Sequence, residues 1–267
     1  MSETPVPISS AILQELTDKV VGAWWRECVD QMMESHFAAE RVHDEALDSL
    51  LARGWCHSYS FTDGLIIRIA ELARAELGDE LDLLMAEFTR RQIDSIRKTA
   101  CEKYPLRSAI LTDAFDAHRA GKYTLSVPTL LPQLDGIGCE VMGLGRNFFA
   151  ERRRADALAG ILQNFQFPSD GRQYPIGGID ERMLAAVERT WSLTLDTNRR
   201  RSGTEYCPLN RHGVLHGLDT DYATEFNSLR CILLIGYMLE VRQVLHEDIP
   251  SQLRGIQQFF ARLDQRA

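Results

Sequence analysis

NRHGVLHG, residues 210–217, opens the most apolar helix that the sequence predicts. Apolar residues recur at helical spacing after it, so we expect one helix from Leu209 to about Leu245, with a kink near Gly217. Pro250 would stop this helix, because proline lacks the amide proton that helical hydrogen bonding needs. A helix this apolar is expected to be buried, with the rest of its domain packed around it.

A second apolar helix is predicted from about Tyr123 to Met142, and it would pack beside the first. It contains Pro128 and Pro132, which we expect to bend it or to mark its first turns. Strand-like alternation is scarce, and further amphipathic stretches predict helices over about 9–33, 38–51, 61–77, 78–99 and 106–119. The sequence therefore predicts an all-α helical bundle.

Pro105 interrupts the helical pattern, and we expect a soft domain boundary there. The predicted parts are then an N-terminal helical region (1–105), a helical bundle (106–248) with an inserted helical pair at about 143–205, and a C-terminal amphipathic helix (249–267).

The composition is that of a soluble globular protein, with 45% apolar and 25% charged residues. No run approaches the roughly 20 apolar residues that span a bilayer, and the start of the chain lacks the basic and apolar regions of a signal peptide. The six cysteines show no zinc-binding spacing, and we interpret them as reduced thiols. We therefore expect a cytoplasmic protein without a membrane segment.

The net charge of −8 argues against a protein that coats nucleic acid through a broad basic face. A local basic site is compatible with that charge. Arg199, Arg200 and Arg201 form a basic cluster about ten residues before Arg211, which makes the cluster a candidate for contact with a negatively charged partner.

The 210–217 motif combines side chains that suit phosphate chemistry. Arginine neutralises a phosphate through a planar fork of donors, and histidine exchanges protons near neutral pH. His212 and His216 are four residues apart and would share one helix face, with Asp219 continuing that side one turn later. Three interpretations of the motif follow.

Two interpretations involve no nucleic acid. His212, His216 and Asp219 could hold a metal ion such as zinc, although a glycine follows His212 where the zinc-protease pattern has a glutamate. Alternatively the motif is structural: its histidines cap the helix start and Arg211 bridges to a nearby acid. The two glycines weigh against this, because each costs about 1 kcal/mol in a helix and suggests close approach of a backbone or ligand.

The third interpretation rests on a resemblance. Arg211, followed by a polar residue and then by His216, forms an R-x4-H pattern at the head of an apolar helix that has an apolar partner helix upstream. This arrangement resembles the signature of the HEPN superfamily, all-α proteins that include many metal-independent endoribonucleases. The resemblance covers about residues 106–245. It implies a HEPN-like bundle and a hydrolase that cleaves RNA without a metal or other cofactor.

The resemblance also implies roles for single residues. His216 would transfer protons at the ribose 2′-hydroxyl or the leaving 5′-oxygen, and Arg211 would hold the scissile phosphate, leaving a 2′,3′-cyclic phosphate. His212 and Asn210 are the next catalytic candidates, for phosphate contact or for orienting His216. HEPN ribonucleases generally form homodimers with both motifs facing one cleft, so two copies of Arg199–Arg201 could line a groove for RNA.

Supporting residues are expected on both apolar helices. On the partner helix, Gln133, Asp135 or Glu140 could supply the further polar side chain that family members often carry. Glu225, Asn227 and Arg230 are too polar for a plain core stripe, so we expect them either in a buried network that fixes the motif helix or the dimer, or on a solvated face.

The family suggests a toxin–antitoxin or anti-phage defence role, with an antitoxin or regulatory partner. Two alternatives to the ribonuclease stay open at this point. One is a non-catalytic HEPN scaffold that binds RNA or dimerises, and the other is a metal-dependent hydrolase that uses His212, His216 and Asp219.

Overall fold

The computed structural model describes residues 38–163 and 207–250 continuously, together with the single residues 19, 25, 27, 28, 31, 34, 184, 186, 187, 193, 251 and 254. In this part of the chain every regular element is a helix and there is no strand, so the predicted all-α class is confirmed. None of the described helices is long and apolar enough to cross a membrane.

The chain forms two compact units, Met1–Glu45 and Ala46–Ala267. Residues 38–45 of the first unit are helical, and every element named below belongs to the second unit. The units do not divide at Pro105, where the sequence suggested a soft boundary. The helices on either side of that proline, α3 (Gly78–Lys103) and α4 (Ser108–Arg119), pack against each other.

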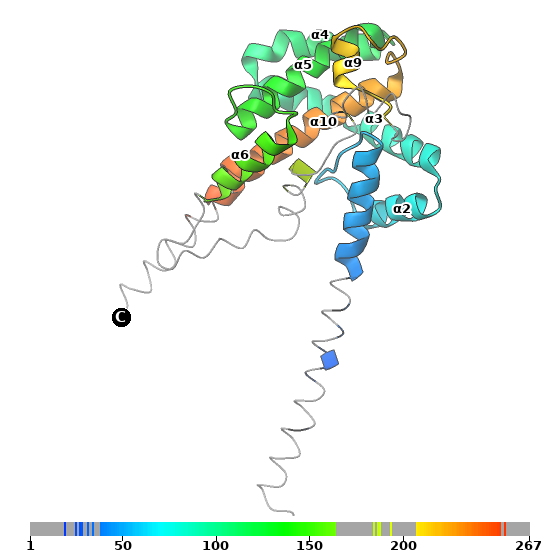
Figure 1. Ribbon diagram of the computed structural model, residues 1–267, viewed down its shortest axis with the longest axis vertical. Helices are drawn as coiled ribbons and strands as arrows, with labels where there is room; N and C mark the ends of the chain where they lie inside the picture. The colour runs from blue at the N-terminus through cyan, green and yellow to red at the C-terminus, as the bar shows by residue number, and fades with distance from the viewer. Residues whose placement is uncertain are drawn as a thin grey trace, which may run out of the picture. The chain divides into compact units, whose positions relative to one another are not determined.

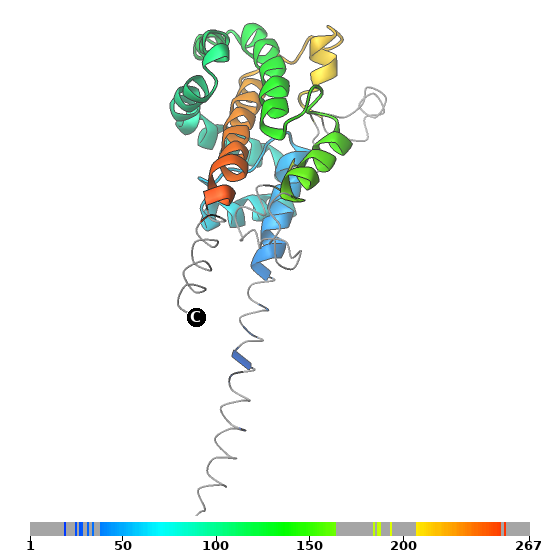
Figure 2. The ribbon, with the colours of Figure 1, turned by 90° about the vertical axis from the view of Figure 1, so that its left-hand side faces the viewer.

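Helix α10 (Glu225–Gln243) is the centre of the second unit. It packs against both α3 and α5 (Tyr123–Met142), as Figure 1 and Figure 2 show. Every residue from Asn227 to Met238 is buried, so the helix is covered around its whole circumference. A helix buried in this way needs neighbours on all sides, which is what α3 and α5 supply.

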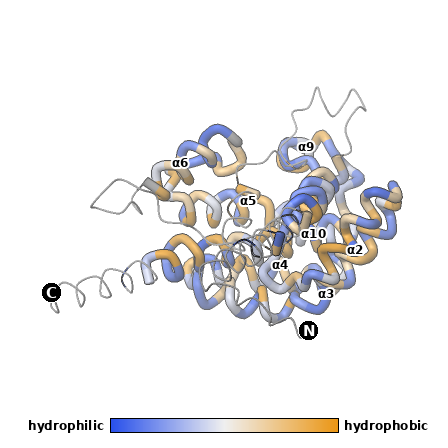
Figure 3. The backbone as a smooth tube through the Cα atoms, turned by 90° about the horizontal axis from the view of Figure 1, so that it is seen from below, coloured by the Kyte–Doolittle hydropathy of each residue, from blue (hydrophilic) through white to orange (hydrophobic). Residues whose placement is uncertain are grey.

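The outer helices bury one side only. Helix α2 (Asp63–Arg74) packs against α3, and α4 packs against both α3 and α5. The tube in Figure 3 accordingly changes between hydrophobic and hydrophilic along these helices. Thr62 caps α2 by accepting a hydrogen bond from the amide of Leu65, and Thr224 caps α10 through the amide of Asn227.

Helix α5 is the second apolar helix that the sequence predicts, with the expected bounds. Pro128 and Pro132 lie inside it, beyond its first turn, and the helix continues through both. Each proline removes a backbone hydrogen bond. The fully buried side chains of Val127, Leu130 and Leu131 offset that loss, because they pack into the core beside the prolines.

The prediction of a single helix over 209–245 is wrong in one respect, because the helical conformation is interrupted between the motif and α10. Arg211–Leu215 form a separate short helix, α9. Gly217 takes a left-handed conformation with φ +67°, and the two amides after it donate to the carbonyl of Gly213. These bonds end α9, in the way that left-handed glycines commonly end helices. Residues 216–224 then form a loop before α10.

The remaining helices lie close to their predicted places. The segment after α3 begins with one 3-10 turn, Pro105–Arg107, which leads into α4. Helix α6 (Glu151–Gln163), the first helix of the predicted insertion, packs against α5. A π-helical turn, Val244–Asp248, extends α10. The helix expected over 9–33, the second inserted helix and nearly all of 249–267 lie outside the described residues.

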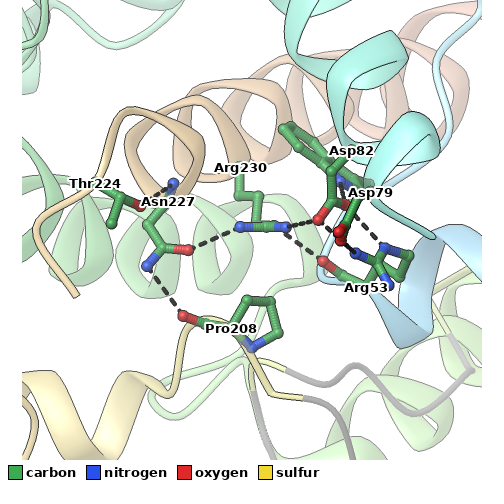
Figure 4. Close-up of polar contacts among 8 residues, drawn as sticks. Arg53, Asp79, Asp82, Pro208, Thr224, Asn227 and Arg230 are labelled. Carbon is green, nitrogen blue, oxygen red and sulfur yellow. Dashed lines mark hydrogen bonds and ion pairs between the residues drawn. The ribbon is translucent and has the colours of Figure 1, made fainter. Parts of the chain in front are cut away.

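A buried polar network ties α10 to its neighbours (Figure 4). The guanidinium of Arg230 donates to Asp82 of α3 (3.0 Å) and to the side-chain oxygen of Asn227 (2.9 Å). It also donates to the backbone carbonyl of Arg53 (2.9 Å) and lies 4.8 Å from the ring centre of Trp55. Every nitrogen of this guanidinium therefore has a partner, although only 4% of the side chain is exposed.

Asp82 is the anion of this network. It accepts hydrogen bonds from the side chains of Arg53 (3.0 and 2.7 Å) and from the indole of Trp55 (2.7 Å), in addition to the bond from Arg230. Burial by itself would raise the pKa of Asp82. The hydrogen bonds from Arg53 and Trp55 and the charge of Arg230 outweigh burial and lower that pKa below its ordinary value. The ion pair is therefore present above about pH 4 and is lost as the pH falls further.

We expect Asp82→Asn to destabilise the second unit strongly. The amide keeps the shape of the carboxylate but leaves the buried charge of Arg230 without its counter-ion. Breaking one side of a buried ion pair costs about 3–5 kcal/mol. Urea unfolding followed by circular dichroism measures the change in unfolding free energy.

Arg90→Ala is the matched control, because Arg90 forms a similar two-bonded pair with Glu225 on the surface. Exposed pairs contribute about 0–1 kcal/mol. An equal loss of unfolding free energy in the two variants would show that the buried Asp82 pair stabilises the protein no more than an exposed pair does.

Candidate active site

Asn210 caps the start of the motif helix α9. The side-chain oxygen of Asn210 accepts a hydrogen bond from the amide of Gly213 at 2.7 Å, and Asn210 itself is buried. Its carboxamide is therefore used inside the protein. It holds the helix start and does not lie on the exposed surface with the histidines.

Asn227 closes the segment that carries α9. Its side-chain nitrogen donates to the carbonyl of Pro208 (2.9 Å) and to the carbonyl of Tyr222 (3.0 Å), while its oxygen accepts from Arg230. The two carbonyls lie at opposite ends of the segment (Figure 4 shows the Pro208 contact). One carboxamide thus joins both ends of the loop to the buried network, which is one of the two places that the sequence left open for Asn227.

Both glycines of the motif have a structural cause. The carboxylate of Asp219 lies against Gly213 so closely that a Cβ there would overlap it. Gly217 provides the left-handed turn after α9. The sequence suggested that these glycines admit a close backbone or ligand, but the neighbour of Gly213 is the side chain of Asp219.

Arg211 is held against α5. Its guanidinium donates to Asp135 at 3.0 Å and lies 5.0 Å from the ring centre of Phe149. Its Nε and the second carboxylate oxygen of Asp135 are buried and have no hydrogen-bond partner. An arginine and a carboxylate can form two parallel hydrogen bonds, and this pair makes one. The guanidinium is therefore positioned but not saturated.

A second arginine supports the ring on which Arg211 stacks. Arg154 of α6 is fully buried and donates to the carbonyls of Phe149 (2.8 Å) and Val187 (2.9 Å). Its neighbours Arg152 and Arg153 are exposed. One member of this arginine run is thus a structural residue, and it fixes the backbone of Phe149.

His212 and His216 present parallel imidazoles on one exposed face. Their ring planes differ by 1° and their centres are 5.9 Å apart. Partial burial lowers the pKa of His212 below its ordinary value, and the charges of Arg211 and His216 lower it further, while Asp135 opposes this. The lowered pKa favours the neutral form of His212 near neutral pH, the form that can accept a proton.

The metal triad considered from the sequence is not assembled. In the described part of the chain no group of three or more histidine, cysteine, aspartate and glutamate side chains is placed to hold a metal ion. Asp219, the expected third ligand, packs against Gly213. The break after α9 accounts for this, because the continuous helix that would have aligned Asp219 with the histidines does not form.

The other residues that the sequence predicted for the site lie away from the motif or outside the described residues. Glu225 pairs with Arg90 on the surface. Gln133 and Glu140, two candidates for the polar residue on α5, both accept from Arg107, so Asp135 is the one that meets the motif. The basic cluster Arg199, Arg200 and Arg201 lies outside the described residues.

Sequence reasoning missed the aromatic platform of the site. Phe149 follows Phe148 in the short stretch between α5 and α6, and no spacing rule connects it with Arg211. The only signal was that pair of aromatic residues beside an arginine run.

The chain matches no model of a protein family, and neither curated proteins nor solved structures contain a significant match to it.

We expect Gly213→Ala to destabilise the motif segment. The new methyl group would overlap the carboxylate of Asp219, and overpacking of this kind costs about 1–3 kcal/mol. Gly160→Ala on α6 is the control: its Cβ would meet open space, and alanine should stabilise that helix by up to about 1 kcal/mol. Thermal unfolding distinguishes the two, and a neutral Gly213→Ala would mean that Asp219 moves aside freely.

Proposed function

We propose that this protein is a metal-independent endoribonuclease of the HEPN type and that the exposed face of α9 is its active site. The observation that carries the proposal is the grouping of an unsaturated guanidinium, Arg211, with two parallel imidazoles, His212 and His216. Cleavage of RNA through its own 2′-hydroxyl needs these groups: a cation for the phosphate and a base and an acid for the two proton transfers.

Arg211 would bind the scissile phosphate. Asp135 and Phe149 hold its guanidinium in place, so little side-chain freedom is lost when a phosphate binds. Its Nε is buried, so Nη1 would be the donor for phosphate oxygens, whose negative charge grows during the reaction. Asp135 has the role that the resemblance to HEPN proteins implies for a polar residue on the partner helix.

The two histidines would divide the proton transfers. His212, whose pKa is lowered, accepts the proton of the 2′-hydroxyl, and the 2′-oxygen attacks phosphorus. As the bond from phosphorus to the 5′-oxygen breaks, His216 donates a proton to that oxygen. The products are a 2′,3′-cyclic phosphate and a 5′-hydroxyl, and the rings exchange protonation states.

A homodimer fits this site. Leu215 and Leu218, next to the histidines, are exposed, and exposed apolar residues beside a polar site suit contact with a second copy. Two facing motifs, with Arg199–Arg201 of both copies, would concentrate positive charge in one groove although the whole chain is acidic. A role in toxin–antitoxin or anti-phage defence, with a neutralising or regulatory partner, belongs to the same proposal.

The purified protein is expected to cleave structured RNA in the presence of EDTA. Arg211→Ala should reduce the rate by about 10²–10³ and His216→Ala by about 10²–10⁴, because each removes transition-state stabilisation or proton transfer. Gel analysis of end-labelled RNA measures the rates. DNA of the same sequence should stay intact because it lacks the 2′-hydroxyl.

Arg91→Ala is the matched control, since Arg91 is an exposed arginine of α3 whose one ion pair among the described residues is with Glu87. It should cleave like the unmodified protein. Cleavage that stops in EDTA would point to a metal-dependent hydrolase. Intact RNA that is nevertheless bound would point to the non-catalytic scaffold.

The division between the histidines is tested with RNA whose leaving 5′-oxygen is replaced by sulfur. A thiolate leaves without a proton, so this substrate needs no general acid. We expect the rate defect of His216→Ala to shrink to less than about tenfold on it, while the defect of His212→Ala persists. The opposite pattern would exchange the two roles, and equal defects on both substrates would contradict the division.

A further inference from the structure

Helices α3 and α10 do not close completely on each other. They run in the same direction, because Arg90 pairs with Glu225 toward one end and Lys103 pairs with Glu247 toward the other. Between these pairs lies a cavity of about 150 Å³ that opens to solvent. The motif residues 210–217 do not line it.

The α3 wall of the cavity is polar. Gln92, Ser95 and Thr99 lie at positions i, i+3 and i+7, so they share one face of the helix. Within the described residues, none of these three side chains makes a hydrogen bond to the protein. Ser95 is exposed and Gln92 and Thr99 are half-buried, so this face borders the open side of the cavity. The donors and acceptors are thus free for a molecule in the cavity.

The α10 wall carries the half-buried carboxyl group of Glu240, which forms no ion pair with any residue in the part of the chain that the structure describes. Glu240 accepts hydrogen bonds from the hydroxyl of Ser58 (2.8 Å) and the amide of Tyr59 (3.2 Å). Burial raises the pKa of Glu240 to about 7, and these two bonds offset burial only in part. The nearby cations, Lys103 and Arg242, both donate to Glu247.

We propose that this cavity binds a small organic monocation, with an ammonium or amidinium nitrogen against Glu240. The cation would provide the positive counter-charge for the carboxylate of Glu240. The hydroxyl oxygens of Ser95 and Thr99 would accept its other hydrogen bonds. Ile96 and Leu233 line the cavity as an apolar wall for the body of the ligand. A cavity of about this volume holds a six-membered ring.

The charges at the ends of the cavity restrict the ligand further. Lys103 and Arg242 share one carboxylate, so that end has an excess positive charge and disfavours a second cationic group. Other ionisable groups around Glu240 are Cys56, Tyr59 and Tyr237. Burial raises the pKa of Cys56 and of Tyr237 well above their ordinary values, so both stay neutral between pH 5.5 and 8. The hydrogen bonds from Lys103 and Arg242 lower the pKa of Glu247, which keeps it ionised.

Benzamidine is a suitable probe, because it is a flat monocation of this size over the whole pH range. Isothermal titration calorimetry with the full chain should show binding at pH 8.0 that weakens by roughly 30-fold at pH 5.5, where few Glu240 groups are ionised. Binding at pH 7 should release protons, which appear as a dependence of the measured heat on the buffer. Benzyl alcohol, which has no charge, should bind weakly and equally at both pH values.

Glu240→Gln keeps the shape of the side chain and should remove both the pH dependence and the proton release, with at least tenfold weaker binding at pH 8.0. Thr99→Leu, which fills the cavity and leaves Glu240 intact, should abolish binding. Glu102→Gln, an exposed carboxylate on α3, is the control and should bind like the unmodified chain. Thermal unfolding verifies that each variant is folded. Unchanged affinity in Glu240→Gln, equal affinity at both pH values, or no binding of benzamidine would overturn the proposal.

Discussion

The ion pair between Arg230 and Asp82 is the interaction on which the second unit depends. It places a charge inside the helix that is buried on every side, so the guanidinium must find all its partners within the protein. Those partners come from α3, from the backbone of residue 53 and from the start of α10. A small shift of α10 along α3 would leave a buried charge unpaired. The pair therefore fixes the register of α3 and α10, which apolar packing alone would specify less tightly.

The same network determines where the motif lies. Asn227 accepts from Arg230 with its oxygen and uses its nitrogen to hold Pro208 and Tyr222. The segment between these residues is too polar and too rich in glycine to continue α10 as a buried helix. It folds outward as α9 and places Arg211 against α5. The position of the candidate active site is thus a consequence of the buried network, transmitted through one carboxamide.

Helical periodicity was sufficient to predict most of the fold. The apolar spacing in α2, α3, α4 and α5 is regular, and their predicted bounds differ from the observed ones by a few residues. The break after α9 was not predictable in the same way, because it depends on a left-handed Gly217 and on the capping contact of Thr224, which outweigh the helical pattern. Site residues were predictable where chemistry marks the side chain, as in Arg211 and Asp135. The roles of Phe149 and the buried Arg154 depend on tertiary contacts, which the spacing of residues along the sequence does not reveal.

The charged groups of this molecule differ in how completely the protein supplies their hydrogen-bond partners. Arg230 has a partner for each nitrogen, and Asp82 has two cations, so neither has capacity for a ligand. Arg211 makes one hydrogen bond and keeps a buried donor unused, although a second carboxylate oxygen is close by. Glu240 likewise has hydrogen bonds but no cation. Leaving such groups incomplete costs folding free energy. Groups that lack partners are better candidates for contact with a ligand than the saturated network, which is the reason to look for ligands at these two residues.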